Sequence, residues 1–396
     1  MANQIAIAHK DYDTRGGGEV FVRRLAEHLD APVVTGRRNQ TNEPGADLDI
    51  REIPLSGIEQ RLIDRGGLGR TLAYALRWPA AHDELSGFDT VITSGNEPLW
   101  WIPDDDQTVI AYTHSTPRFM YDLFNETTDF SGAKSRLKAL FYQAQRVVYE
   151  SNVRRPDVWV ANSELVARRM ELYWNLDPDT IEVVHPPVDT HHFSPEAAPT
   201  EDFYLHLGRL AGHKRVDEVI EAWHEIDAPL VVAGDGPERD ALEAEAPANV
   251  EFRGFVDEAE KRRLMSAARA LVYPPANEDF GMVPIEALAA GTPVIGVRDG
   301  FTRFQIRDGD CGVLWDRGAL RDAVARFERE GVAWTPHEIA EYATTNWSID
   351  RFHEEIDAVI AAAREQTAIE VDLDNPIPGV KLLDQSAAAT DGGGDG

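Results

Sequence analysis

The stretch ALVYPPANEDFGMVPIEALAAGTPVIGV, residues 270–297, decides the fold. Its two ends, at 270–273 and 293–297, are apolar runs of strand length, and the segment between them predicts a helix over about 283–290. Pro284 suits the first turn of that helix, and Gly291 suits the position just after its end. A strand, a loop, a helix and a second strand in this order indicate a parallel α/β sheet.

Two glutamates stand where the first of these strands meets the helix. Glu278 lies in the loop, and Glu286 lies within the first two turns of the helix. Ligands of open parallel sheets bind at this edge, and the N–H groups of residues 280–283 would hold an anion. A nucleotide-sugar, with hydroxyls on both sides of a phosphate, is such a ligand. The pair alone is equally compatible with two solvated glutamates in an acidic protein.

The flanking sequence resembles the donor-binding signature of the retaining glycosyltransferases of family 4, or group 1, which have the GT-B fold. The family pattern is E-x-F-G-x-x-x-x-E followed by A-x-G-x-P-V-I. The residues that match it are Glu278, Phe280, Gly281, Glu286, Ala289 or Ala290, Gly291, Pro293, Val294 and Ile295. The resemblance implies that Glu278 bonds the donor sugar and that Glu286 holds the ribose. The amides that would face the sugar and diphosphate belong to Phe280, Gly281, Met282 and Val283.

A second motif supplies cations. LHLGRLAGHKRVDEVIEAW, residues 205–223, places Arg209 and Lys214 between a strand and a helix, where they can neutralise a diphosphate. It resembles the family's G-R-L-x-x-x-K-G element, whose Arg and Lys stabilise the departing diphosphate, although Arg215 replaces the usual glycine. Two solvated basic residues are the alternative, which the scarcity of cations in this chain disfavours.

Two glycine-rich loops also match the family. VVAGDGPERDAL resembles its A-G-x-G-P loop, with Gly234 and Gly236 near the nucleotide. A dehydrogenase is excluded, because the third glycine of the dinucleotide fingerprint is missing. RGGGEVFVRRLAEHL follows the first strand and matches the G-G-x-E loop through Gly16, Gly17 and Glu19. In the family that loop lies across the cleft from the donor phosphates.

YTHSTPRFMYDL places His114 just past the end of a strand. It resembles the H-[ST]-P-x-R-[YF] box of a subset that often uses GDP-mannose. The spacing differs, because Thr116 is inserted and Arg118 follows Pro117 directly. A lone histidine is more often structural, but this context favours a sugar-contacting role. The predicted catalytic group is therefore Arg209, Lys214, Glu278 and His114.

The composition narrows the partners and the compartment. The net charge is −30, and only six of the 39 basic residues are lysine, which resembles the proteins of salt-accumulating halophiles such as halophilic archaea. This acidity argues against a nucleic-acid partner. The single cysteine, Cys311, rules out a disulfide framework and fits a reducing cytoplasm. No apolar run is long enough to span a membrane.

We expect neither a cofactor nor an essential metal. The run Asp104, Asp105 and Asp106 follows a proline and precedes a strand, which favours a solvated turn over a metal-binding D-x-D. The adjacent His191 and His192 lack zinc-ligand spacing. Arg209, Lys214 and backbone amides would then balance the charge of the diphosphate.

The alternation of strands and helices predicts an α/β protein of GT-B architecture, with two Rossmann-like domains facing across a cleft. Residues 1–190 would form the acceptor domain and 191–346 the nucleotide-sugar donor domain. Residues 347–367 would form a helix that packs back on the first domain, with Ser348 as its N-cap. Residues 368–396 would be an acidic, disordered tail.

Residues 134–155 concentrate cations in a chain that otherwise avoids them. The stretch contains six Lys and Arg residues and one opposing carboxylate, Glu150, with three aromatic residues interleaved. A basic amphipathic stretch indicates an anionic acceptor, such as a lipid phosphate, or peripheral contact with a membrane surface. A helix packed inside the first domain with an arginine-rich exposed face is an equal alternative.

These features together predict a cytoplasmic retaining glycosyltransferase. It would move a hexose, with mannose from GDP-mannose as a candidate, to a glycan or a polyprenyl-phosphate-linked acceptor in surface-glycan or glycoprotein biosynthesis. Two alternatives are a nucleotide-sugar 2-epimerase of the same fold and a non-catalytic nucleotide-sugar-binding protein. After Val297 the family often has G-G-x-x-E, whereas this chain continues Asp299-Gly300-Phe301 with no glutamate near Gln305.

Overall fold

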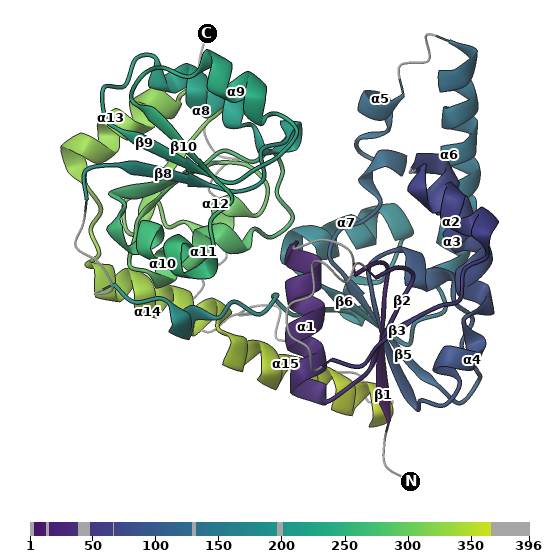
Figure 1. Ribbon diagram of the computed structural model, residues 1–396. Helices are drawn as coiled ribbons and strands as arrows, with labels where there is room; N and C mark the ends of the chain where they lie inside the picture. The colour runs from purple at the N-terminus through teal and green to yellow at the C-terminus, as the bar shows by residue number, and fades with distance from the viewer. Residues whose placement is uncertain are drawn as a thin grey trace, which may run out of the picture. The chain divides into compact units, whose positions relative to one another are not determined.

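The computed structural model describes residues 4–12, 16–38, 48–65, 67–128, 132–195 and 201–365. The chain divides into two compact units (Figure 1). Unit 1 contains the chain up to Pro187 and the C-terminal helix from Phe352. Unit 2 contains Val188–Arg351. The predicted tail lies outside the described residues.

Unit 1 is built on a parallel sheet. Within the described residues it has seven strands in the order β3-β2-β1-β4-β5-β6-β7. The strands are β1 (Ile5–His9), β2 (Val33–Thr35), β3 (Ile50–Glu52), β4 (Thr90–Ser94), β5 (Thr108–Thr113), β6 (Val158–Ala161) and β7 (Ile181–Val183). The helices are α1 (Gly17–Leu29), α2 (Gly57–Asp64), α3 (Gly67–Arg77), α4 (His82–Leu85), α5 (Phe124–Thr127), α6 (Ala133–Asn152), α7 (Glu164–Trp174) and α15 (Ile349–Glu365).

The core of unit 1 follows from the alternation of side chains along its buried strands. Ile7 of β1 packs with Phe21 of α1 and Phe352 of α15 in one cluster. Its neighbours Ala6 and Ala8 join a separate cluster. Both clusters are apolar because a parallel sheet is covered on both faces. The last helix of the chain therefore completes the core of the first unit.

Unit 2 repeats this plan. Within the described residues it has six strands, all paired in parallel, in the order β10-β9-β8-β11-β12-β13. The strands are β8 (Tyr204–Leu207), β9 (Leu230–Ala233), β10 (Val250–Gly254), β11 (Ala270–Tyr273), β12 (Val294–Val297) and β13 (Gly312–Trp315). The helices are α8 (Val216–Trp223), α9 (Arg239–Glu245), α10 (Glu258–Ala267), α11 (Met282–Ala289), α12 (Thr302–Gln305), α13 (Leu320–Glu330) and α14 (Pro336–Trp347).

Both sheets have the strand order of a Rossmann fold, so the prediction of an α/β protein with two Rossmann-like domains is confirmed. In each sheet the order reverses beside the first strand. The switch point lies between β1 and β4 in unit 1 and between β8 and β11 in unit 2. Ligands of such sheets bind at the carboxyl ends of the strands next to this point. Each unit therefore offers one expected ligand edge.

The C-terminal helical region differs in detail from the prediction. Trp347 ends α14, and the next helix, α15, begins at Ile349. The prediction of Ser348 as N-cap is confirmed, since the backbone N–H of Arg351 lies 3.4 Å from its Oγ. None of the helices in the described ranges combines the length and apolar content needed to cross a membrane.

Candidate active site

The two predicted cations of unit 2 lie after β8, at the carboxyl edge of its sheet. Lys214 ends the 3₁₀ turn η7 (Gly212–Lys214), and its Nζ lies 2.6 Å from Oε2 of Glu278 in the loop after β11. Arg209 is exposed and makes no ion pair with the residues that the structure describes. The fold thus brings together, at the switch point, a cation and a carboxylate that are 64 residues apart.

The backbone of Glu278 is held by the segment that departs from the family pattern. The N–H of Phe301 donates to the carbonyl of Glu278 at 2.8 Å. Gly300 has a φ of 56°, and a Cβ there would lie 2.4 Å from the nitrogen of Glu278. A carboxylate of Asp299 accepts from the N–H of Asn277 at 3.0 Å. Asp299-Gly300-Phe301 therefore supports the Glu278 loop through backbone contacts and the carboxylate of Asp299 rather than through a glutamate.

The start of α11 presents backbone N–H groups, and a buried glutamine fixes the carbonyls just before it. The Nε2 of Gln305 donates to the carbonyls of Phe280 at 2.8 Å and Gly281 at 2.9 Å. Gly281 is the N-cap residue and has a φ of 82°, which favours glycine. The N–H groups of Met282 and Val283 lie in the first turn, where helical N–H groups have no partner within the helix. This geometry suits a phosphate.

Glu286 lies inside α11 and is paired with a lysine that the sequence analysis did not select. The Nζ of Lys261 on α10 lies 2.9 Å from Oε1 of Glu286 and 2.8 Å from Oε2 of Glu258. Burial lowers the pKa of Lys261, but the two carboxylates outweigh this and raise it overall. Lys214 and Lys261 are the two lysines in the described part of unit 2, and each pairs with one glutamate of the signature.

The glycines of the loop after β9 allow two loops to pack backbone against backbone. A Cβ on Gly234 would lie 1.8 Å from the carbonyl oxygen of Gly208, and one on Gly236 would lie 2.2 Å from that of Leu210. Both contacts are shorter than any side chain tolerates. The two glycines thus support the loop that carries Arg209.

Three residues meet at the switch point of unit 1. His9 ends β1, Ser94 ends β4 and His114 follows β5. Nδ1 of His9 lies 3.1 Å from both the carbonyl oxygen and Oγ of Ser94. Oγ of Ser94 lies 2.9 Å from Nε2 of His114. Of these, the sequence analysis selected only His114.

The positions of the hydrogens in this series of hydrogen bonds, from His9 through Ser94 to His114, follow from which atoms can donate and which can only accept. The carbonyl of Ser94 only accepts, so Nδ1 of His9 carries a hydrogen. Ser94 is fully buried, and Nε2 of His114 is the acceptor for its hydroxyl hydrogen among the described residues. His114 is then the neutral tautomer with its hydrogen on Nδ1. Burial, with a smaller contribution from the charge of Lys10, lowers the pKa of His114 to about 3, which agrees with a neutral ring.

The glycine loop of unit 1 begins α1. Gly16 is the N-cap residue, and its N–H donates to Oε2 of Glu19 at 3.1 Å. Gly17 is the first residue of the helix. Glu19 is buried, and its carboxylate accepts this hydrogen bond from the N-cap residue, so it has a structural partner. The predicted contact of these residues with the donor stays a prediction.

The aspartates and histidines that the sequence analysis weighed for metal binding do not form a metal-binding cluster among the described residues. Asp104–Asp106 form a turn before β5, where the N–H of Asp104 bonds the side chain of Gln107 at 2.9 Å. His191 lies 2.8 Å from Asp350, and the described residues contain no cluster of three His, Cys or carboxylate groups that could hold a metal. Cys311 is fully buried, and burial raises its pKa to about 12, so it is not a nucleophile.

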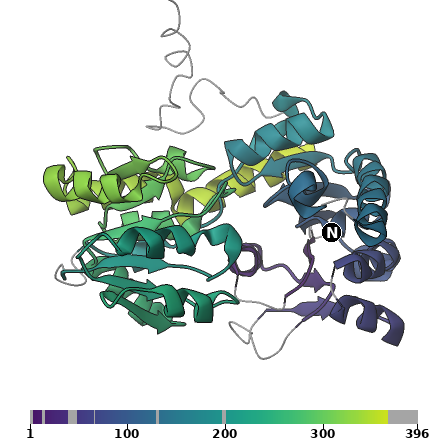
Figure 2. The same cartoon turned by 90° about the horizontal axis from the view of Figure 1, so that it is seen from above.

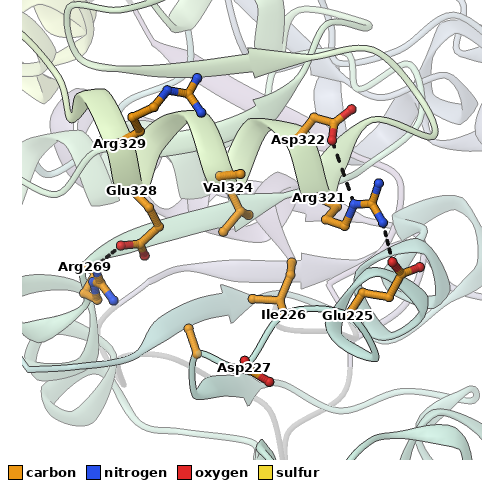
Figure 3. A pocket seen from close by; sticks show the side chains of 11 residues that line it. Glu225, Ile226, Asp227, Arg269, Arg321, Asp322, Val324, Glu328 and Arg329 are labelled. Atoms are coloured by element: carbon orange, nitrogen blue, oxygen red, sulfur yellow. Dashed lines mark hydrogen bonds and ion pairs between the residues drawn. The ribbon is translucent and has the colours of Figure 1, made fainter.

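A hollow of about 650 Å³ lies at the opposite edge of the sheet of unit 2 (Figure 3). Figure 3 shows two of its arginines paired with carboxylates, Arg269 with Glu328 and Arg321 with Glu225. The third, Arg329, pairs with Glu330. Arg269 precedes β11, so the hollow lies at the amino ends of the strands. Its cations are already neutralised, and ligands of such sheets bind at the other edge. We therefore place the candidate site at the carboxyl edge.

Comparison with known proteins agrees with this fold. The family model described as Glycosyl transferases group 1 matches residues 187–346, and that described as Glycosyltransferase Family 4 matches residues 15–192. The chain belongs to the group 1, or family 4, glycosyltransferases, which have the GT-B fold.

Named relatives and solved structures extend this comparison. The D-inositol 3-phosphate glycosyltransferase of a Nocardioides species is 31% identical over 215 residues, 45% of this chain and 47% of the relative. A GDP-mannose-dependent alpha-(1-6)-phosphatidylinositol dimannoside mannosyltransferase of Mycobacterium tuberculosis is 34% identical over 146 residues, 34% of this chain and 38% of the relative. The chain thus spans about half, or less, of the curated relatives it matches.

Two solved structures are similar over most of this chain. The sucrose-phosphate synthase of Thermosynechococcus elongatus has a TM-score of 0.71 and 16% identity, with 92% of this chain and 100% of that chain covered. HepE of Anabaena, solved with UDP and glucose, has a TM-score of 0.66 and 15% identity, with 91% and 100% covered. At this identity the likeness shows the shared fold.

Proposed function

We propose that the chain is a retaining glycosyltransferase that moves a hexose from a nucleotide-diphosphate sugar to an acceptor hydroxyl. The observation that carries the proposal is the meeting of Lys214, Glu278 and the first turn of α11 at the carboxyl edge of one sheet. A cation and backbone N–H groups there would bind the diphosphate, and the carboxylate of Glu278 would accept hydrogen bonds from the sugar. The family supports this assignment.

The proposed reaction needs charge stabilisation more than a protein nucleophile. The bond from the anomeric carbon to the phosphate oxygen breaks, and the bond to the acceptor oxygen forms on the same face of the sugar. The proton of the acceptor hydroxyl passes to the departing diphosphate. Arg209, Lys214 and the amides of α11 would stabilise the charge that develops on that leaving group. No metal is required in this scheme.

The first donor to test is GDP-mannose. The printed name of the mycobacterial relative specifies GDP-mannose, and His114 lies in a box that resembles one from GDP-mannose users. The UDP complex of HepE makes UDP-sugars the second class to test. We further propose a lipid-phosphate-linked acceptor, such as a polyprenyl phosphate, at the cytoplasmic face of a membrane. The cation-rich α6 supports an anionic acceptor of this kind.

The proposal is tested with a panel of radiolabelled GDP-, UDP- and ADP-sugars and a membrane lipid extract. We expect one donor class to raise the melting temperature and its sugar to enter the lipid fraction with retained configuration. Isomerised free donor without transfer would identify an epimerase. Donor binding with neither product would identify a binding protein, and either result would overturn the proposal.

A further inference from the structure

α6 packs on unit 1 through aromatic and small side chains, whereas its aliphatic side chains lie on the outward side. The residues that it buries are Ala139, Gln145, Tyr149 and Asn152. Gln145 and Asn152 are polar, while the ring of Tyr149 packs in a core cluster and its hydroxyl donates to the carbonyl of Asn96 at 2.9 Å. A helix that packs on a core normally turns its apolar stripe inward. The inward contacts of α6 do not account for its aliphatic residues.

Those aliphatic residues form one exposed stripe. Leu137, Leu140 and Val147 are 67%, 68% and 68% exposed, and Val148 is 43% exposed. At about 100° per residue, these four positions lie within roughly 100° of one another around the helix. No other helix of the described residues has as many exposed large apolar side chains. A contiguous patch of this kind marks an interaction site, whereas isolated exposed apolar residues do not.

Cations flank this stripe. Lys134 and Arg136 are exposed and fall on its two sides at the N-terminal end of α6, and Arg154 is exposed just beyond its C-terminal end. The one carboxylate of the helix, Glu150, is paired with Arg146 at 2.7 Å. Figure 1 draws the N-terminal turns of α6 beyond the sheet of unit 1, and Figure 2, seen from above, draws the helix at the margin of that unit. An anionic surface would therefore meet exposed positive charge on both sides of the stripe.

We propose that the outward stripe of α6, Leu137, Leu140, Val147 and Val148, inserts into the headgroup region of an anionic lipid bilayer, with Lys134 and Arg136 beside it on the lipid phosphates. A helix with an apolar stripe and cations at its edges lies in the plane of such an interface. The chain has a net charge of −30, but at 0.1 M salt charges more than about 10 Å away are largely screened. The cations of α6 then dominate the contact.

This inference deepens the proposed function, since it names the surface from which a lipid-linked acceptor would be taken. Its test needs neither donor nor acceptor. The full chain is sedimented with vesicles of phosphatidylglycerol and phosphatidylcholine, and with vesicles of phosphatidylcholine alone. Partitioning is measured at 0.1 M and 1 M KCl. We expect binding to the anionic vesicles that weakens, without vanishing, at the higher salt concentration.

Two variants separate the apolar contribution from the charged one. Leu137→Gln/Leu140→Gln leaves the charge unchanged and should lower the partition coefficient about tenfold for each leucine removed, at both salt concentrations. Lys134→Gln/Arg136→Gln should lower it at 0.1 M KCl only. Leu172→Gln on α7 is the matched control, because Leu172 is 61% exposed in the same unit and should be neutral.

Circular dichroism spectra and nucleotide-induced melting shifts of all variants establish whether the fold is intact. If the double leucine variant misfolds, the single variant Val147→Gln takes its place. Wild-type protein that stays in the supernatant at 0.1 M KCl overturns the inference. So does a leucine variant that binds like the wild type. A wild-type dimer that the leucine variant abolishes, without vesicle binding, would make the stripe an interface between copies. If the transfer assay shows no sugar transfer, the proposed function fails, but vesicle binding by the wild type would still support the membrane inference.

Discussion

The ion pair between Lys214 and Glu278 allows a sharp test of the proposed chemistry. Their charged atoms lie 2.6 Å apart, and the side chains are 22% and 20% exposed. If Lys214 stabilises the leaving diphosphate, Lys214→Met should lower kcat about 10²- to 10³-fold. This is the effect of removing one preorganised donor from a developing oxyanion, about 2.7–4 kcal/mol.

A purely structural role for Lys214 predicts a different pattern. The lysine would then matter only because it neutralises Glu278, through a charge-assisted hydrogen bond worth about 1.5–3 kcal/mol. In that case Lys214→Met should have no further effect once Glu278→Gln has removed the negative charge. A role in the transition state predicts that Lys214→Met still lowers kcat by two or more decades in the Glu278→Gln background. The double-mutant cycle distinguishes the two roles.

The assay is single-turnover transfer of radiolabelled sugar at saturating donor, with urea unfolding of each variant alongside. Arg215→Met is the matched control. Arg215 is the adjacent cation, and it pairs with Glu218 at 2.6 Å and Asp217 at 3.3 Å on the next helix. It should keep near-normal turnover. If Lys214→Met has no effect in the Glu278→Gln background, the reasoning about the leaving group is refuted.

Four other outcomes are expected. Ser94→Ala should lower kcat/KM about fivefold, because one hydrogen bond of about 1 kcal/mol no longer fixes the tautomer of His114; nitrogen-15 NMR of the ring should then show exchange between tautomers, and an unchanged spectrum would contradict the hydrogen-bond chain. Lys261→Met should raise the KM for the donor more than it lowers kcat, since it removes the partner of Glu286 in the proposed ribose site. Steady-state kinetics measure both constants, and a kcat that falls more than KM rises would contradict this role. Activity should survive EDTA in high-KCl buffer, and loss that Mn²⁺ restores would overturn the metal-free scheme. Burial lowers the pKa of His206 to about 4, so the unfolded state binds the extra proton between pH 6.5 and 4; its contribution to the free energy of unfolding should fall by about 2 kcal/mol from pH 7 to 5, and His206→Gln should flatten that part of the urea-unfolding profile.

The sequence predicted unit 2 well because its signals are local. Pro284 and Gly291 bracket the helix, and the observed α11 begins and ends one residue before the predicted bounds. Helices α2 and α3 were not predicted, since Gly66, Gly67 and Gly69 interrupt the helical pattern there. α14 was missed as well, although Thr335 closes a capping box at its start.

The contacts of the site were less predictable than its motifs. The hydrogen bonds between His9 and Ser94 join residues 85 positions apart, and they exist because β4 lies beside β1 in the sheet. A sequence read element by element does not reveal that order. Both residues stand at the carboxyl ends of strands, which is the one sequence signal that could have selected them.

The use of lysine offers a further signal, and it explains why the site contains two kinds of cation. This chain uses arginine at most basic positions, yet both signature glutamates pair with lysines, Lys214 and Lys261. Arginine binds a carboxylate through two parallel hydrogen bonds and would hold it in one orientation, whereas the ammonium of lysine is a point charge on a flexible stem. A carboxylate that must exchange a protein partner for the hydroxyl of a sugar or ribose is better matched to lysine. Arg209, which has no carboxylate partner among the described residues, keeps its planar group for the bidentate recognition that a phosphate favours. Lys214→Arg should therefore keep the charge but slow turnover, by holding Glu278 away from the donor, and wild-type turnover in that variant would contradict this division of roles.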